Sequence, residues 1–123
     1  FSSFNESKAK YLVISVPTFS LTVLMEHVFQ NVYPRQLGGV HTHLYTNQSL
    51  NYIFNKFKLK IVGEWWFGTD LMDFKRSIIS SDQKNQKFSK IVNNYFKDIT
   101  DEMQNSIDKK KISSEAHIIL KKK

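Results

Sequence analysis

The apolar run Tyr11-Leu-Val-Ile-Ser-Val16 constrains the fold of this chain more than any other segment. It is short and nearly continuous in apolar and β-branched residues, and Pro17 ends it, which is typical of a strand buried on both faces of a sheet. We therefore predict a central parallel strand here. Such a strand needs a neighbour on each edge, and only two further candidate strands exist. We expect at least one edge of the sheet to be completed by polypeptide outside this sequence.

Two further segments have the pattern of strands. Residues alternate in character from 59 to 67, which is the period of a strand with one better-covered face. The residues that share one face in this prediction are Leu59, Ile61, Gly63, Trp65 and Phe67. Trp66 then points to the opposite face from Trp65, so one indole belongs to the core and the other faces a pocket. Residues 115–120 form the closing strand, with Ala116, Ile118 and Leu120 on one side.

Four segments have apolar residues at helical spacing. The predicted helices cover residues 21–31, 46–58, 70–81 and 87–107, the last being a single long amphipathic helix. Thr46 is placed to cap the second helix. The buried stripe of that helix is Leu50, Ile53, Phe54 and Phe57. Strands and helices in this order predict an α/β layer fold with few strands, in a single domain spanning residues 1–123.

The composition excludes several classes of protein. With no cysteine among 123 residues, disulfides and thiol nucleophiles are absent, which fits a reducing compartment. There is no run of about 18 apolar residues and no signal-peptide pattern, so we expect a cytoplasmic protein without a membrane span. The chain begins with Phe1 rather than with methionine, and we expect further sequence upstream.

The formal net charge of +7 suggests nucleic-acid binding, because clustered Lys and Arg gain affinity for phosphates by releasing counterions. The longest basic runs are nevertheless lysines in a turn and in a tail, at residues 109–111 and 121–123. Arginine, the better reader of phosphates and bases, occurs only at positions 35 and 76. We keep a basic nucleic-acid-binding domain as an alternative and do not expect it.

His41-Thr-His43 is the segment richest in possible chemistry. Two residues apart on a strand, both rings would lie on one face, and a carboxylate such as Asp70 could complete a metal site. In the simpler interpretation, one histidine hydrogen-bonds near the next helix and the other faces solvent. His-x-His alone does not specify a metal site, and our prediction contains none.

Charged side chains near the predicted helix 70–81 have two interpretations. Asp70 and Asp73 lie at its start, where carboxylates stabilise the helix dipole without catalytic duty. Arg35, in the loop before Gly38-Gly39, could hold a carboxylate or phosphate of a ligand, or could be an exposed loop residue. The chain contains neither Gly-x-Gly-x-x-Gly nor a P-loop, so no cofactor-binding residues are predicted within it.

Four segments of the chain resemble, in order, the C-terminal half of the class I S-adenosylmethionine-dependent methyltransferases. These segments are residues 10–18, 43–57, 59–67 and 115–120. The likeness depends on the strand that ends at Pro17 and on His43-Leu-Tyr-Thr46, with Ser49-Leu50 at the opening of a helix. It implies a partial Rossmann-like three-layer fold whose strands are the last three of a seven-stranded sheet. In that sheet the seventh strand lies antiparallel between the fifth and the sixth.

The same resemblance implies the function and the site. The chain would be the substrate-side half of a methyltransferase acting on a small-molecule or metabolite acceptor. S-adenosylmethionine would be bound mainly by an N-terminal half or partner subunit outside this sequence, so we expect no turnover from this segment alone. Residues 68–114 would be a helical insertion between the last two strands. The implied acceptor-pocket residues are His41 and His43, one of them as general base, with Arg35, Tyr45, Trp66 and Asp70.

A different class of function remains open. The chain could be a non-enzymatic α/β interaction module that forms a homodimer. The predicted contact would be an exposed sheet edge or the amphipathic helix of residues 87–107.

Overall fold

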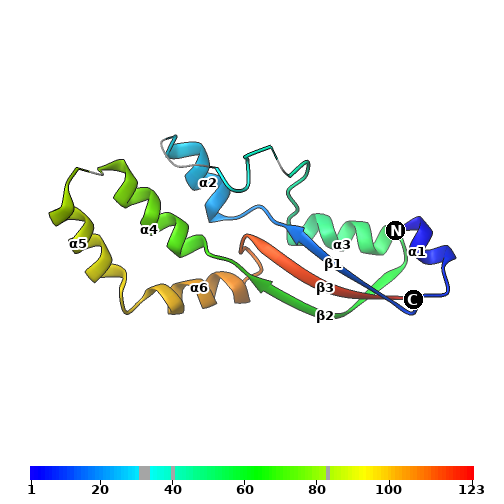
Figure 1. Cartoon of the computed structure of the whole chain (residues 1–123). Helices are drawn as coiled ribbons and strands as arrows, with labels where there is room; N and C mark the ends of the chain where they lie inside the picture. Colours follow the sequence, from blue (N-terminus) through cyan, green and yellow to red (C-terminus); the bar gives the residue numbers. More distant parts are fainter. Residues whose placement is uncertain (31–33, 40, 83) are drawn as a thin grey trace.

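The computed structural model describes residues 1–30, 34–39, 41–82 and 84–123, which form three strands and six helices (Figure 1). The elements are α1 (Ser2–Glu6), β1 (Tyr11–Pro17), α2 (Leu21–Val28), α3 (Asn47–Lys56), β2 (Leu59–Phe67), α4 (Asp70–Ser81), α5 (Gln86–Phe96), α6 (Thr100–Lys109) and β3 (Glu115–Lys122). The three predicted strands and the predicted helices 46–58 and 70–81 are confirmed. α2 ends at Val28, and Asn31, the predicted end of that helix, lies outside the described residues.

The three strands form one sheet in the order β1-β3-β2. β3 is antiparallel to both neighbours, so β1 and β2 are parallel to each other on either side of it. The expected antiparallel place of the last strand between the other two is confirmed. The prediction of a central parallel strand at residues 11–16 is wrong for this chain. β1 lies at an edge with an antiparallel partner, because the chain enters β3 from the helices beyond the end of β2 and runs back (Figure 1).

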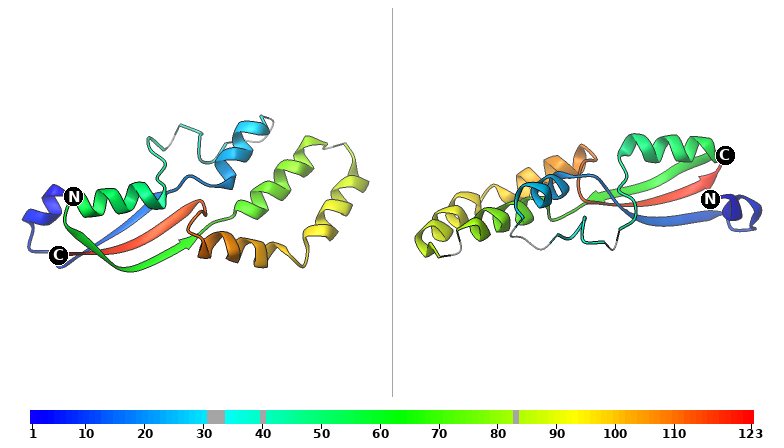
Figure 2. Two further views of the ribbon diagram at one scale, coloured as in Figure 1. Left: turned by 180° about the vertical axis from the view of Figure 1, so that it is seen from behind. Right: turned by 90° about the horizontal axis from the view of Figure 1, so that it is seen from above.

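One face of the sheet is covered by α3 (Figure 2). A capping box begins this helix, as predicted for Thr46: its hydroxyl accepts from the N–H of Ser49 at 3.1 Å, and its own N–H donates to the Ser49 hydroxyl at 2.9 Å. The buried residues of this core are Phe4, Leu50, Phe54, Leu59, Trp66, Ala116, Ile118 and Leu120. The predicted inward residues of α3 and β3 are therefore confirmed.

A β-bulge in β2 decides which tryptophan is buried. The register with β3 shifts between Ile61 and Gly63, so Val62 is an extra residue and the alternation changes face there. Trp66 consequently lies in the core with 6% of its surface exposed, whereas Trp65 is 63% exposed on the opposite face. The predicted sharing of one face by all odd-numbered residues of this strand is wrong for this reason.

The face of the sheet opposite α3 lies largely open. Four large apolar side chains on it are exposed: Tyr11 and Val13 of β1, Trp65 of β2 and Ile119 of β3. In the residues that the structure describes, the sheet and α3 make two layers. The third layer of the expected fold stays a prediction that requires chain from outside this sequence.

The remaining helices α2, α4, α5 and α6 lie beyond the carboxyl ends of β1 and β2 (Figure 2) and form a second apolar cluster. Its buried residues are Leu71, Val92 and Phe96. The single helix predicted for residues 87–107 is wrong, because the chain breaks between α5 and α6. The break lets α5 pack on α4 while α6 returns to the end of β2, which one straight helix could not do. No helix in the described ranges is long and apolar enough to cross a membrane.

Candidate functional site

The carboxyl ends of β1 and β2 lie at the same end of the sheet, beside the amino end of β3 (Figure 1). We call this end of the sheet its carboxyl edge. Pro17 of β1 and Phe67 of β2 both lie opposite Glu115 there. In open α/β sheets, ligands bind outside the carboxyl ends of the strands. This edge is therefore the expected position of a ligand.

A hollow of about 290 Å³ opens at this edge between β1 and β3. Its lining residues are Ser15, Val16, Pro17, His41 and Glu115. His41 is exposed, so its imidazole is accessible to a ligand. A hydroxyl, an imidazole and a carboxylate around one small hollow provide hydrogen-bond donors and acceptors.

An aromatic cluster continues from the hollow across the open face of the sheet. The ring centre of Phe67 lies 4.7 Å from those of both Trp65 and His117. The strand register puts His117 opposite Ser15, and Glu115 opposite Phe67. The rings therefore adjoin the polar groups of the hollow. We call Ser15, His41, Trp65, Phe67, Glu115 and His117 together the carboxyl-edge site.

Tyr45 and His43 approach the same edge from the loop before α3. The backbone of Tyr45 accepts from the N–H of Phe19 at 2.8 Å and donates to the carbonyl of Pro17 at 3.1 Å, which forms a short parallel bridge beside β1. The Tyr45 ring packs against the core and is stacked with the exposed His43 ring. Tyr45 thus anchors the segment that carries His41.

Asp70 is fully buried and joins three segments instead of facing the hollow. Its Oδ1 accepts from the N–H and the hydroxyl of Thr22, at 3.2 and 2.8 Å, and its Oδ2 accepts from the N–H of Ser114 at 3.0 Å. These bonds tie α2, α4 and the start of β3 together. The structure does not bring this carboxylate to His41 or His43. No group of three His, Asp or Glu side chains that could hold a metal ion occurs in the ranges described.

Trp66 is likewise held inside the fold. Its Nε1 donates to Glu64 at 3.0 Å, and the ammonium of Lys111 bonds to the other oxygen of that carboxylate. Burial raises the pKa of Glu64, but the hydrogen bonds from Lys111 and Trp66, with the positive charge of Lys111, outweigh it and leave this pKa below its ordinary value. The indole exposed toward the carboxyl-edge site is that of Trp65.

Arg35 lines a different hollow, against α4. Its Nη1 donates to Asp73 at 2.7 Å and also bonds to the hydroxyl of Thr69. Among the predicted acceptor residues, His41 lines the hollow, His43 and Tyr45 lie in the same loop outside it, and Arg35, Trp66 and Asp70 lie elsewhere.

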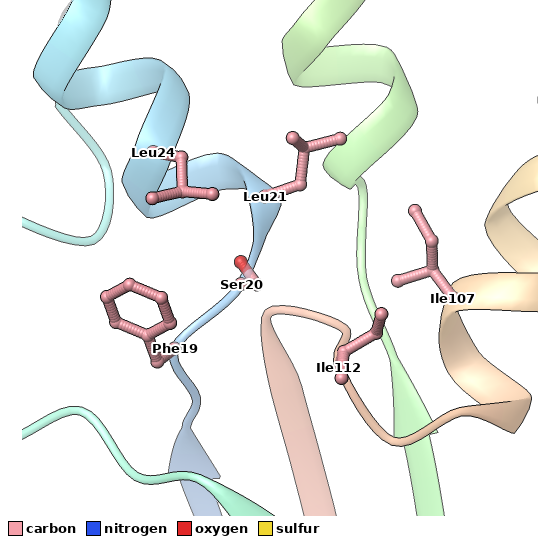
Figure 3. Close-up of a pocket in the computed structure, with 6 residues that line it drawn as sticks. All are labelled: Phe19, Ser20, Leu21, Leu24, Ile107 and Ile112. Atoms are coloured by element: carbon pink, nitrogen blue, oxygen red, sulfur yellow. The ribbon is translucent and has the colours of Figure 1, made fainter.

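A third hollow, of about 390 Å³, is almost entirely apolar (Figure 3). It is lined by Phe19, Ser20, Leu21, Leu24, Ile107 and Ile112. The hydroxyl of Ser20 is engaged, because it accepts from the N–H of Thr22 as the cap of α2. The lining offers no group for acid–base chemistry, so we do not place the site there.

Among the residues of the carboxyl-edge site, His41 was predicted, whereas Glu115 and His117 were not, and Trp66 was predicted in place of Trp65. For the residues of β3 a signal existed: the alternation that turns Ala116, Ile118 and Leu120 inward also turns Glu115 and His117 to the other face. For β2, alternation put Trp65 and Phe67 on one face, but which indole is buried depends on the bulge, which is set by pairing with β3.

No family model matches the sequence, and no curated protein or solved structure matches the chain significantly. The chemistry of the site therefore rests on its geometry. It offers polar groups of Ser15, His41 and Glu115 beside the aromatic rings of Trp65 and Phe67.

Proposed function

We propose that this chain is the acceptor-side half of an S-adenosylmethionine-dependent methyltransferase with a Rossmann-like three-layer fold. The observation that carries the proposal is the sheet order β1-β3-β2, with β3 antiparallel between two mutually parallel strands. The sequence resemblance implies this order and these directions for the fifth, seventh and sixth strands of the family. The resemblance depends on four segments of sequence, so the pairing of the strands supports the proposal separately.

The outer edge of β1 provides further support. The N–H of Thr18 donates to the chain just before β3 at 2.9 Å, and alternate residues of a strand point to opposite edges. The backbone groups of Tyr11, Val13 and Ser15 consequently point away from β3. Among the described residues outside β3, Tyr45 pairs with this edge, beside Thr18. A parallel strand from the N-terminal half would fill the remainder, and helices of that half would cover the open face around Tyr11 and Val13, away from the carboxyl-edge site.

The carboxyl-edge site would receive the methyl acceptor. S-adenosylmethionine supplies an already activated methyl group, so catalysis needs mainly positioning and desolvation of the acceptor. His41 would take the proton that the acceptor loses. Ser15 and Glu115 would hydrogen-bond its polar groups, and the rings of Trp65 and Phe67 would form its apolar wall.

The residues that grip the cofactor are expected outside this chain. Gly68 follows β2 directly, but a Cβ built there would lie 2.3 Å from the hydroxyl of Ser114 and 2.5 Å from a carboxylate oxygen of Asp70. The space beside this glycine is therefore filled by the chain itself and is no cradle for a phosphate or ribose. The N-terminal half or a partner subunit would hold the cofactor.

The experiment that tests the proposal starts from the intact mass of the polypeptide in its original cells. We expect a mass above 14.5 kDa by on the order of a hundred residues, the size needed to complete a domain. The long form should bind S-adenosylmethionine in a calorimetric titration. A native mass of 14.5 kDa without a copurifying second half, or a long form that does not bind the cofactor, would contradict the proposal.

Within that long form, His41→Ala should lower the rate of methyl transfer by about 10²-fold or more, as loss of a general base does, and leave cofactor affinity unchanged. His43→Ala is the matched control, since His43 is exposed and lies outside the hollow. Equal effects of the two substitutions would remove His41 from the proposed role.

The open edge and face also favour a second candidate, a non-enzymatic interaction module. A native mass of 14.5 kDa combined with a dimer in solution would put that candidate first. Nucleic-acid binding has less support, because lysines of both basic runs make contacts within the fold. Lys111 bonds to Glu64, and Lys122 donates to the carbonyl of Ser7 and lies 5.0 Å over the ring of Phe4.

A further inference from the structure

The hollow against α4 has a volume of about 440 Å³ and shares no lining residue with the carboxyl-edge site. Cationic side chains from two separate segments meet in it: Arg35 from the loop before residue 40, and Lys75 and Arg76 from α4. One carboxylate, Asp73, lies among them. These four side chains leave two positive charges without a neutralising partner in the lining of the hollow.

Asp73 holds the two arginines in place. Its side chain is 7% exposed; Oδ2 accepts from Nη1 of Arg35 at 2.7 Å, and Oδ1 lies 3.1 Å from Nη2 of Arg76. Thr69 donates to Oδ2 at 3.1 Å and also bonds to Arg35. A buried carboxylate that engages one terminal nitrogen of each guanidinium fixes both groups at the wall of the hollow, as a preorganised binding site requires.

The loop that carries Arg35 is fastened independently. The carboxylate of Glu26 in α2 accepts from the N–H groups of Arg35, Gln36 and Leu37, at 2.6 Å, 2.8 Å and 2.8 Å. The position of the Arg35 guanidinium is therefore set from the backbone side and from the side-chain side.

Much of the donor capacity of the two arginines remains available. A guanidinium has five N–H donors in a planar fork that matches phosphate and carboxylate oxygens. In the part of the chain that the structure describes, each arginine side chain uses one terminal nitrogen, and the two side chains are 40% and 51% exposed. Met72 and Ile79 add apolar lining for the organic part of a ligand.

We propose that this hollow, which we call the arginine pocket, binds the phosphoryl group of a small ligand. Arg35 and Arg76 would each donate to phosphoryl oxygens, Lys75 would add charge, and Asp73 would position the two arginines. The inference does not depend on the proposed function, since the arginine pocket lies apart from the carboxyl-edge site.

The test is calorimetric titration of the 123-residue chain with inorganic phosphate, pyrophosphate and a nucleoside diphosphate at one matched ionic strength. The variant Arg76→Gln removes an exposed guanidinium and leaves the Arg35–Asp73 pair intact. Lys90→Gln, an exposed charge on α5, is the control for net charge. Circular dichroism and thermal unfolding verify that each variant is folded.

We expect at least one of the three ligands to bind, with affinity lowered about tenfold or more by Arg76→Gln and changed less than about twofold by Lys90→Gln. Tighter binding of the nucleoside diphosphate than of pyrophosphate would identify a nucleotide as the better ligand; the reverse order would identify the phosphoryl groups alone. No binding of any of the three at millimolar concentration, or equal weakening by both substitutions, would overturn the proposal.

Discussion

At the scale of single residues, Gly68 is the glycine with the least room for an added side chain. A Cβ there would meet Ser114 and Asp70 at distances that real contacts do not reach. We expect Gly68→Ala to lower the free energy of unfolding by about 1–3 kcal/mol through overpacking, measured by urea denaturation. Gly63→Ala is the control, because its nearest contact would be an ordinary 3.4 Å to Ile119. Similar losses at the two glycines would contradict this account.

Asp70 is the residue on which the junction of sheet and helices depends. Its carboxylate accepts hydrogen bonds from the N–H and the hydroxyl of Thr22 and from the N–H of Ser114. Asp70 is 0% exposed, so these bonds are shielded from solvent. Asp70→Ala leaves the Thr22 hydroxyl and the Ser114 N–H buried without an acceptor, whereas the Thr22 N–H keeps its bond to Ser20, so we expect a loss of about 3 kcal/mol or more in urea denaturation. Asp101→Ala, at an exposed position in the first turn of α6, should cost less than about 1 kcal/mol. A small effect at Asp70 would mean that water or another group satisfies these donors.

Glu64 gives the fold an acid-sensitive contact. Because its pKa in the folded protein lies below the ordinary value of 4.5, its contribution to stability is complete above the pKa of the unfolded chain. That contribution disappears as the pH falls through the lower pKa of the folded state. Glu64→Gln should therefore flatten the loss of stability between about pH 5 and pH 3, measured by urea denaturation at several pH values. The same substitution at exposed Glu102 should leave the profile unchanged.

At the scale of elements, the two tryptophans of β2 separate what sequence can predict from what it cannot. Alternation correctly predicted a strand and opposite faces for the pair, but the bulge at Val62 decides which one is buried. The extra residue is imposed by the register with β3, so no local pattern in β2 announces it.

The buried and exposed indoles give a matched pair of variants. Trp66→Ala should cost about 3–5 kcal/mol in the free energy of unfolding, because it empties a site in the core. Trp65→Ala should cost only about 1 kcal/mol, from its contacts with Phe67 and His117. The reverse order in chemical denaturation would show that the strand lacks the bulge in solution.

The helices show the same difference between what local sequence predicts and what tertiary packing decides. Apolar spacing correctly predicted α3 and α4, whose inward stripes follow one helical period. The same spacing continues through residues 97–99, yet the chain turns there, since only a turn lets Phe96 join the second apolar cluster while α6 reaches β2. Tertiary packing therefore breaks the helix although the apolar helical spacing continues without interruption.

At the scale of the whole molecule, the site was predicted only where its residues cluster in the sequence. His41 lies in a conspicuous polar segment, whereas Glu115 and His117 join it from the far end of the chain through the pairing of β3 with β1. That the three strands would leave an edge of the sheet unpaired was predicted, because a strand as apolar as Tyr11–Pro17 is poorly suited to an edge and few candidate strands exist beside it. Its open side could be identified only from the order of the strands.

That open side should govern how the isolated chain behaves. Exposed apolar patches and free strand edges promote association, and a lysine on an edge strand opposes it. We expect the 123-residue chain to self-associate in sedimentation velocity and to bind a hydrophobic dye, and Val13→Lys to reduce both. Val13 is 68% exposed on this face, in the edge strand β1, so the substitution should leave folding intact; Tyr52→Lys is the control, because Tyr52 is 69% exposed on α3. If Tyr52→Lys acts as strongly, or if the unaltered chain stays monomeric and binds no dye, the open face is not the interaction surface.

If only Val13→Lys acts, the same substitution should next be made in the long form. A face covered there by an N-terminal half would bury this lysine, so Val13→Lys should lower the free energy of unfolding of the long form.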